Sequence, residues 1–270
     1  MIEIGCSTLG FRFDSLDTAL TEIQAQGFRR LDVVMVPSYC PHFDVLGSSE
    51  NEQVELQEKL SSMGFALSTL NTGDGRLGDP ARRQGAIDHA RASLRLGQKL
   101  GVYAITIQSG VETPPHAWLD VARGVAADIR ELAVEAESLG LDLTVELHKE
   151  ALMATGQQAL DLMELIDHPA AGVALDPSHA THAGENPADV ARRLGDLVRH
   201  VHLRDAVGTN ILVVPGDGEV DFPGFARALS EIGYGRVAAI ELEYEHATAG
   251  TVRDDLARAR PVIDEAFVDA

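Results

Sequence analysis

Eight short apolar runs alternate with longer stretches of helical periodicity along this chain. The short runs have the length of buried strands, and the longer stretches repeat apolar residues at helical spacing, as in "DSLDTALTEIQAQG". Strands and helices that alternate in this way are typical of a parallel sheet joined by helical crossovers. The predicted strands cover residues 2–5, 31–34, 66–70, 104–107, 142–146, 172–176, 198–203 and 237–241.

A single α/β domain of the (β/α)₈ barrel type is the fold that this pattern favours. The 270 residues fit one such barrel, and no Pro/Gly/Ser-rich linker divides them, so we expect residues 1–270 to form one domain. The last helix is predicted at about 252–267. An open doubly wound sheet is the main alternative, although the first strand lacks the GxGxxG turn of a dinucleotide site.

The charge of the chain limits its partners. Its 42 acidic and 22 basic side chains give a net charge of -20, which repels phosphate backbones and anionic membranes. Cys6 and Cys40 form no CxxC motif, and "MIEIGCSTLG" has no signal-peptide pattern, so we expect a reduced, cytoplasmic setting. We expect a small-molecule partner, no nucleic acid and no membrane; a homo-oligomer is compatible with a barrel of this kind.

Polar residues stand at the ends of the last four predicted strands: Glu146, Asp176, His202 and Glu241. In a barrel these strand ends meet at one face, where three ionised carboxylates would repel each other strongly. One divalent cation would compensate them, and the oxygen-rich set favours Mn²⁺ or Mg²⁺, with Co²⁺ or Zn²⁺ as alternatives. The alternative for each residue alone is a polar group that solvates a helix N-terminus.

Several neighbouring residues are candidates for substrate binding. His148 lies two positions after Glu146 and therefore shares its face, unless it is a loop histidine bonded to the backbone. Arg204 follows His202 by two positions and offers a planar fork to an anion or a hydroxyl pair, with a surface salt bridge as the alternative. Three more polar residues could reach the barrel mouth or merely stabilise loops: His42, Asn71 and Gln108.

Five motifs resemble one family: "VELH" at 145–148, "LDPSH" at 175–179, "VHLRD" at 201–205, "PGDGEVDF" at 215–222 and "IELE" at 240–243. They are similar to the xylose isomerase-like barrels, in particular the group of ketose 3-epimerases, hydroxypyruvate isomerases and inosose dehydratases. The resemblance implies that Glu146, Asp176, His202 and Glu241 hold the metal and that the two glutamates are the acid/base pair. It also implies a substrate contact for His179.

The same superfamily contains apurinic endonucleases with three zinc ions. Their pattern has extra histidines after strands three and four and an Asp-x-His after strand seven. This chain has Asn71, Gln108 and "AVGTNILVVP" at those places. Together with the net charge of -20, these differences argue against the endonuclease reading.

The metal site predicts a sugar isomerase or epimerase. A cation that chelates a ketone and a neighbouring hydroxyl acidifies the carbon beside them, and Glu146 and Glu241 could move the proton. A dehydratase or lyase of a cyclic keto-polyol or a dehydroshikimate-like acid is the first alternative, with His148 and Arg204 protonating the leaving group and binding an anion. The second is a non-catalytic accessory barrel that binds metal and sugar, although such a module needs no proton-transfer pair.

Overall fold

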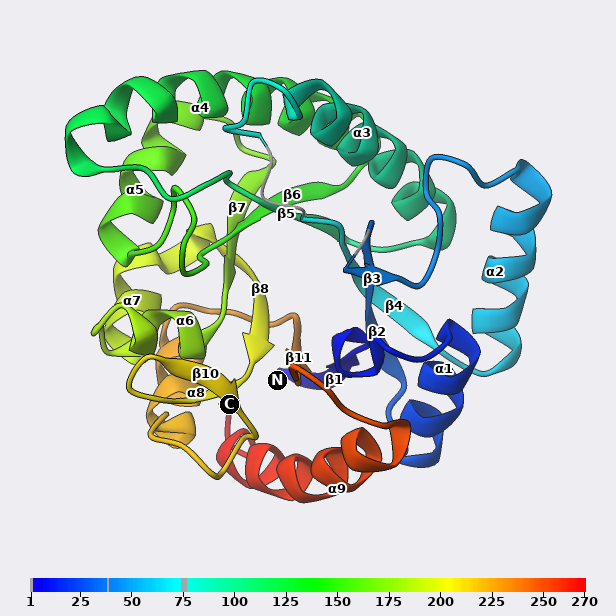
Figure 1. Cartoon of the computed structure of the whole chain (residues 1–270). Helices are drawn as coiled ribbons and strands as arrows, with labels where there is room; N and C mark the ends of the chain where they lie inside the picture. Colours follow the sequence, from blue (N-terminus) through cyan, green and yellow to red (C-terminus); the bar gives the residue numbers. More distant parts are fainter. Residues whose placement is uncertain (1, 38, 74–76) are drawn as a thin grey trace.

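In the computed structural model, which describes residues 2–37, 39–73 and 77–270, eight parallel strands close into a barrel (Figure 1). Strand β1 pairs with both β2 and β11, which closes the ring. The predicted (β/α)₈ class is confirmed, and the open sheet is excluded because it would leave two unpaired edges. The barrel strands are β1 Glu3–Ser7, β2 Arg30–Val36, β4 Ala66–Asn71, β5 Ala104–Gln108, β6 Asp142–Glu146, β7 Ala171–Leu175, β8 Val198–Leu203 and β11 Val237–Ile240.

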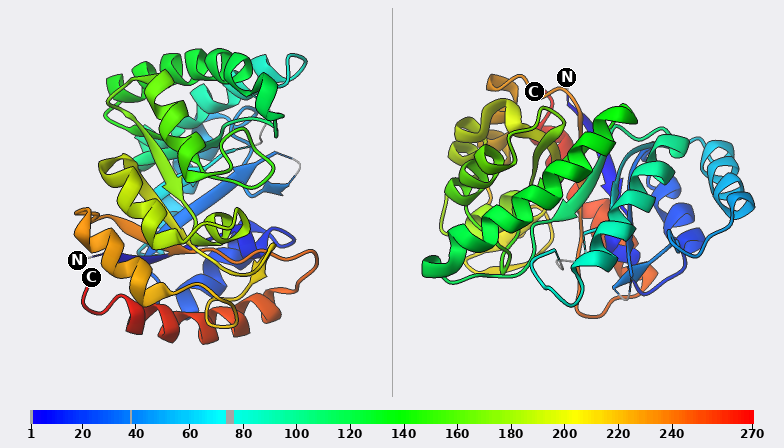
Figure 2. Two further views of the ribbon diagram at one scale, coloured as in Figure 1. Left: turned by 90° about the vertical axis from the view of Figure 1, so that its left-hand side faces the viewer. Right: turned by 90° about the horizontal axis from the view of Figure 1, so that it is seen from above.

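Helices surround the strands as an outer ring (Figures 1 and 2). The last helix begins at Ala249, three residues before its predicted start. Two 3-10 turns, η1 Leu9–Phe11 and η2 Gly195–Leu197, belong to the connections. The helices are α1 Leu16–Ala25, α2 Glu50–Ser62, α3 Arg83–Leu100, α4 Pro115–Ser138, α5 Gly156–Ile166, α6 Pro177–His182, α7 Pro187–Leu194, α8 Phe222–Glu231 and α9 Ala249–Ala266.

Local sequence signals explain several helix ends. The Ser49 hydroxyl accepts the Glu52 N–H, and the Glu52 carboxylate accepts the Ser49 N–H at 2.8 Å, so that α2 begins with a capping box. Helix α3 ends at Gly101, whose φ of 74° is a conformation that glycine adopts without a Cβ clash. Asp221 accepts the Gly224 N–H at 2.9 Å at the start of α8.

Two long loops at the carboxyl end of the barrel carry short strands. After β2, strand β3 (Cys40–Pro41) pairs antiparallel with the end of β2. After β8, strands β9 (Asp205–Val207) and β10 (Asn210–Val213) form an antiparallel hairpin. Both additions follow the carboxyl ends of barrel strands, where (β/α)₈ barrels build their sites.

A buried carboxylate organises the loop that follows the hairpin. Asp205 accepts backbone N–H groups from Gly216, Gly218 and Val220 at 2.9, 3.0 and 3.0 Å. A carboxylate that accepts several backbone donors holds a loop in one shape. This bonding gives the "GDG" sequence at residues 216–218 a structural role in the loop.

The barrel interior is polar in part, whereas the layer between strands and helices is apolar. Thr69, Thr106 and Thr144 are fully buried, and the hydroxyls of Thr106 and Thr144 lie 2.9 Å apart. The chain ends meet at one end of the barrel, where the Ile2 N–H donates to the carbonyl of Ala270 at 3.3 Å (Figure 2). Among the described residues, no helix is both long and apolar enough to cross a membrane.

Candidate active site

Four acidic or imidazole side chains meet at the carboxyl end of the barrel. Glu146 is the last residue of β6, Asp176 follows β7, His202 lies near the end of β8 and Glu241 follows β11. Each side chain is at most 3% exposed, and one ligand atom from each lies within 4.8 Å of all the others. The structure therefore brings together the four residues proposed above as metal ligands.

His202 lies at the centre of this cluster. Its Nδ1 is 3.0 Å from Glu146 Oε1 and 3.5 Å from Glu241 Oε2. On the other side of the ring, Nε2 is 2.9 Å from an oxygen of Asp32, a buried residue of β2. The imidazole thus separates the cluster from a further carboxylate inside the barrel.

Arg204 lies beside this cluster and bonds three carboxylates. Its Nε lies 3.0 Å from Asp176 Oδ2, its Nη2 lies 2.7 Å from Glu241 Oε2, and its Nη1 is bonded to Glu243. The side chain is 2% exposed, so it is not a surface salt bridge. Ser7 on β1 donates its hydroxyl to the other oxygen of Glu241 at 3.1 Å.

The two glutamates of the cluster differ in their electrostatic surroundings. Burial raises the pKa of Glu241 to about 7, against the opposing charges of His202 and Arg204. Burial acts in the same direction on Glu146, but the hydrogen bond and charge of His202 outweigh it and lower the pKa of Glu146 to about 2. Burial lowers the pKa of His202, whereas Glu241, Asp32 and Glu146 together raise it well above the usual value. The surrounding carboxylates therefore stabilise the protonated, positively charged form of the His202 imidazole.

The donor set fits one divalent cation. Ligand atoms about 2.0–2.6 Å from one ion are separated by roughly 3–5 Å from each other, which agrees with the 4.8 Å limit of the cluster. Three carboxylates and one imidazole are ligands for Mg²⁺, Mn²⁺ and Zn²⁺ alike. A cation there would supply the positive charge that the buried carboxylates require.

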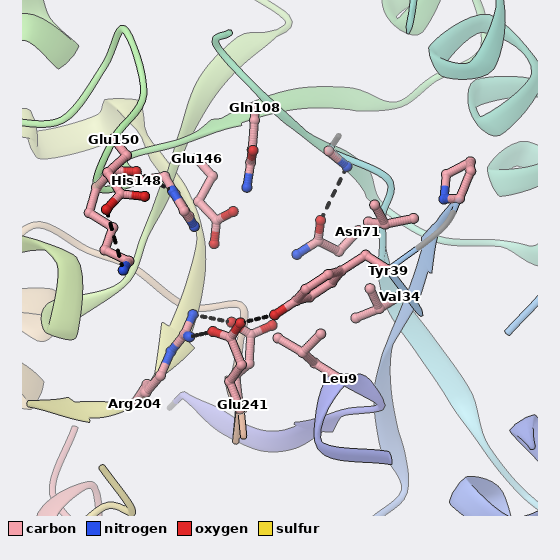
Figure 3. A pocket seen from close by; sticks show the side chains of 15 residues that line it. Leu9, Val34, Tyr39, Asn71, Gln108, Glu146, His148, Glu150, Arg204 and Glu241 are labelled. Carbon is pink, nitrogen blue, oxygen red and sulfur yellow. Dashed lines mark hydrogen bonds and ion pairs between the residues drawn. The ribbon is translucent and has the colours of Figure 1, made fainter. Parts of the chain in front are cut away.

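A cavity of about 440 Å³ opens beside the cluster. Glu146, Glu241 and Arg204 form part of its wall, and Asn71 and Gln108 reach it from β4 and β5 (Figure 3). In Figure 3 the side chains of Glu146, Asn71 and Gln108 point toward the same central space. The structure thus places these two amides, which the sequence made pocket candidates, in the same cavity as the charged residues, with Gln108 directly beside Glu146 in the sheet.

The remaining candidates are placed differently. His148 lines the cavity, and its Nδ1 lies 2.5 Å from the carbonyl oxygen of Lys149. Its ring packs against that of His179 at an interplanar angle of 48°, with centroids 4.1 Å apart. His179 is fully buried, and its Nε2 has no hydrogen-bond partner among the described residues. His42 bonds the Thr8 hydroxyl at 3.0 Å and, in the described part of the chain, lies outside the cavity wall.

Burial lowers the pKa of His179 well below its usual value, and the neighbouring His148 and Arg204 act in the same direction. His179 is therefore neutral at physiological pH. The neutral ring offers one hydrogen-bond donor and one acceptor, and it carries no positive charge that would attract an anion.

Four residues of the site were not singled out from the sequence. Asp32 and Ser7 bond His202 and Glu241, as described. Glu243 bonds Arg204 and also accepts the hydroxyl of Tyr39, which belongs to the loop after β2. Asp32 carries a usable signal, since an ionisable residue inside the apolar run "LDVVMV" must find buried partners. Tyr39 carries none, because a loop brings it to the site from a distant strand.

Comparison with known proteins agrees with this geometry. The sequence profile of the xylose isomerase-like TIM barrel family matches residues 20–262. An inosose dehydratase of Clostridium perfringens is 25% identical over 187 residues, which are 59% of this chain and 61% of that protein. The match thus covers less than two thirds of the curated relative's length.

Solved structures share the whole fold. The IOLI protein, solved with a bound zinc atom, has a TM-score of 0.82 at 18% identity, over 98% of both chains. The D-psicose 3-epimerase of Clostridium cellulolyticum H10, solved with D-tagatose, has a TM-score of 0.79 at 19% identity, over 98% of this chain and 99% of that one. With the family profile spanning most of its length, the chain belongs to the xylose isomerase-like TIM barrel family.

Proposed function

We propose that this protein is a divalent-metal-dependent isomerase or epimerase of a ketose or keto-polyol, working as one barrel domain. One observation carries the proposal: two buried glutamates, Glu146 and Glu241, enter the same cavity from β6 and β11 within a cluster that fits a cation. The similarity to sugar epimerases and to an inosose dehydratase supports an enzyme that acts on carbohydrates.

In this proposal Glu146, Asp176, His202 and Glu241 hold the metal ion. When bound, the ion polarises a substrate carbonyl and so acidifies the neighbouring C–H group. One glutamate removes the proton from that carbon, and the other returns a proton to its opposite face or to the adjacent carbon. The first outcome is epimerisation and the second is aldose-ketose isomerisation. Asn71 and Gln108 orient the substrate by bonding its hydroxyls from the ends of β4 and β5.

We favour Mn²⁺ or Mg²⁺ as the native ion because three of the four ligands are carboxylates. The zinc atom in the IOLI structure makes Zn²⁺ a direct competitor. Metal analysis of protein purified without chelators decides between them.

A dehydratase is the second candidate. His148 lines the cavity two residues from Glu146 and packs against the buried, neutral His179, so an imidazole that could protonate a leaving hydroxyl lies near the proposed base. The inosose dehydratase relative supports the same reading. In that reaction the carbon loses its proton and the β-hydroxyl leaves as water.

An isotope experiment separates the candidates. The metal-loaded protein is incubated in D₂O with ketoses, with inososes and with dehydroshikimate, and the products are followed by NMR. Deuterium at the α-carbon without loss of water is the expected result for an isomerase or epimerase. An enone product assigns the dehydratase instead. Absence of both exchange and loss of water with every substrate contradicts both enzymes and favours the accessory, binding-only role.

A further inference from the structure

We propose that Asp32 is a positioning residue that fixes the tautomer and orientation of His202, so that Nδ1 is the nitrogen offered to the metal ion. The inference rests on the metal-binding part of the proposed function. It does not depend on which reaction the protein catalyses.

The two nitrogens of His202 have different neighbours. Nε2 lies 2.9 Å from Asp32 Oδ2, and both side chains are fully buried. Nδ1 lies 3.0 Å from Glu146 Oε1, so without a cation each nitrogen can carry a proton and donate it to a carboxylate. A bound cation would replace the proton on Nδ1, the nitrogen that faces the other three proposed ligands, while Nε2 would keep its proton and its bond to Asp32. The bond to Asp32 therefore favours Nδ1 as the nitrogen offered to the metal ion.

Asp32 is itself held in place by a chain of hydrogen bonds through the barrel. Thr69 donates its hydroxyl to Asp32 Oδ1 at 2.7 Å. His200 Nε2 lies 3.3 Å from the same hydroxyl, and the Tyr103 hydroxyl lies 2.9 Å from His200 Nδ1. Because Thr69 uses its proton on Asp32, it accepts from His200 Nε2–H, and Tyr103 donates to His200 Nδ1. Each group then has one consistent role.

The same atoms could be taken for a second metal site. One ligand atom each from Asp32, His200 and His202 lie within 4.8 Å of one another. However, the oxygens of Asp32 already accept bonds from Thr69 and His202, and His200 is bonded at both nitrogens. This bonding identifies Asp32 as the partner of a metal-ligating histidine, an arrangement that fixes the ring and raises its basicity.

Metal affinity tests the inference without a substrate. We expect Asp32→Asn to weaken Zn²⁺ and Mn²⁺ binding by about 10–100-fold, measured by competition with a chromophoric chelator. Thr69→Val removes a donor to Asp32 and should weaken binding by a smaller factor. Thr106→Val is the matched control, since it removes a barrel hydroxyl that bonds Thr144 instead. Affinities of Asp32→Asn and Thr69→Val equal to wild type would overturn the inference.

The wild-type protein provides an independent test should Asp32→Asn fail to fold. Long-range ¹H–¹⁵N NMR spectra of the Zn²⁺-loaded protein should show His202 protonated at Nε2 and bound to zinc through Nδ1. Zinc on Nε2, or two ions per chain with one lost in His200→Gln, would contradict the proposal. If Zn²⁺ binds as expected but no sugar reacts, the proposed function fails and the role of Asp32 stands.

Discussion

The two halves of the barrel mouth differ in charge. The half built by β6, β7, β8 and β11 presents Glu146, Asp176, His202, Arg204 and Glu241, all buried and ionisable. The half built by β2, β4 and β5 presents Val34, Asn71 and Gln108, which carry no charge. In the proposed enzyme, the charged half would hold the metal and move protons, and the neutral half would recognise hydroxyl groups.

The difference has a physical basis. Charged groups are stable in a buried site only when they compensate one another, so they are grouped rather than spread around the ring. Amide side chains both donate and accept hydrogen bonds, and they can bond sugar hydroxyls in either sense. Changes in the charged half should therefore affect catalysis and stability, and changes in the neutral half should affect substrate affinity.

The largest effect is expected from removal of the proton-transfer groups. Glu146→Gln and Glu241→Gln should each lower the rate of deuterium exchange by about 10²–10⁴-fold, the usual contribution of a general acid or base. Glu55→Gln, an exposed position on α2, serves as the control for a lost carboxylate and should leave the rate unchanged. Exchange at the wild-type rate in either site variant would remove the proposed mechanism.

Arg204 should dominate the stability of the charged half. Arg204→Met leaves buried carboxylates without their partner and should lower the free energy of unfolding of the metal-free protein by about 3–5 kcal/mol in urea titrations. The comparison is Arg192→Met, which breaks a pair that is 42% exposed on the arginine side and should cost less than about 1 kcal/mol. Equal effects of the two substitutions would show that the site does not depend on this guanidinium.

Removal of the metal should destabilise the protein to a lesser extent. A ligand at about 100 times its Kd stabilises the native state by about 2.7 kcal/mol, which corresponds to roughly 5–10 °C in Tm for a domain near this size. Calorimetry before and after EDTA treatment measures the shift, and added Mn²⁺ should restore the original Tm. The same Tm in both samples would argue against a resident ion.

The smallest effect belongs to the neutral half. Asn71→Leu and Gln108→Leu keep approximate size but remove hydrogen bonds to substrate, each worth about 0.5–1.5 kcal/mol. KM should therefore rise about 2–12-fold with little change in kcat, as measured by initial rates. A loss in kcat comparable to that of Glu241→Gln would contradict the assignment of catalysis to the charged half and substrate recognition to the neutral half.

The fold could be predicted from the sequence to within a few residues. The predicted strands 142–146 and 198–203 coincide with β6 and β8, since apolar runs bounded by polar residues mark buried parallel strands. The four strand-end residues were predicted for the same reason, because parallel strands of a closed barrel end on one face. Here local pattern and overall architecture lead to the same positions.

The second layer of the site depends on contacts that no local pattern specifies. Ser7 and Glu241 lie 234 positions apart in sequence, and Tyr39 reaches Glu243 across 204 positions. His200 stands two positions before His202 in the same strand, so alternation alone places both on one face. Only the three-dimensional packing shows that His202 joins the four-residue cluster, whereas His200 is linked to Asp32 through the Thr69 hydroxyl.

The bond between Ser7 and Glu241 joins the first barrel strand to the last. The ribosome synthesises a chain from its N-terminus at about 5–20 residues per second. Strand β11 can therefore pair with β1 only after more than 230 further residues have been made. The proposed ligand set is incomplete throughout that interval. A nascent chain that has not reached Glu241, or a chain truncated before it, lacks the fourth proposed ligand, so no earlier stage of synthesis could offer an ion the full set of four.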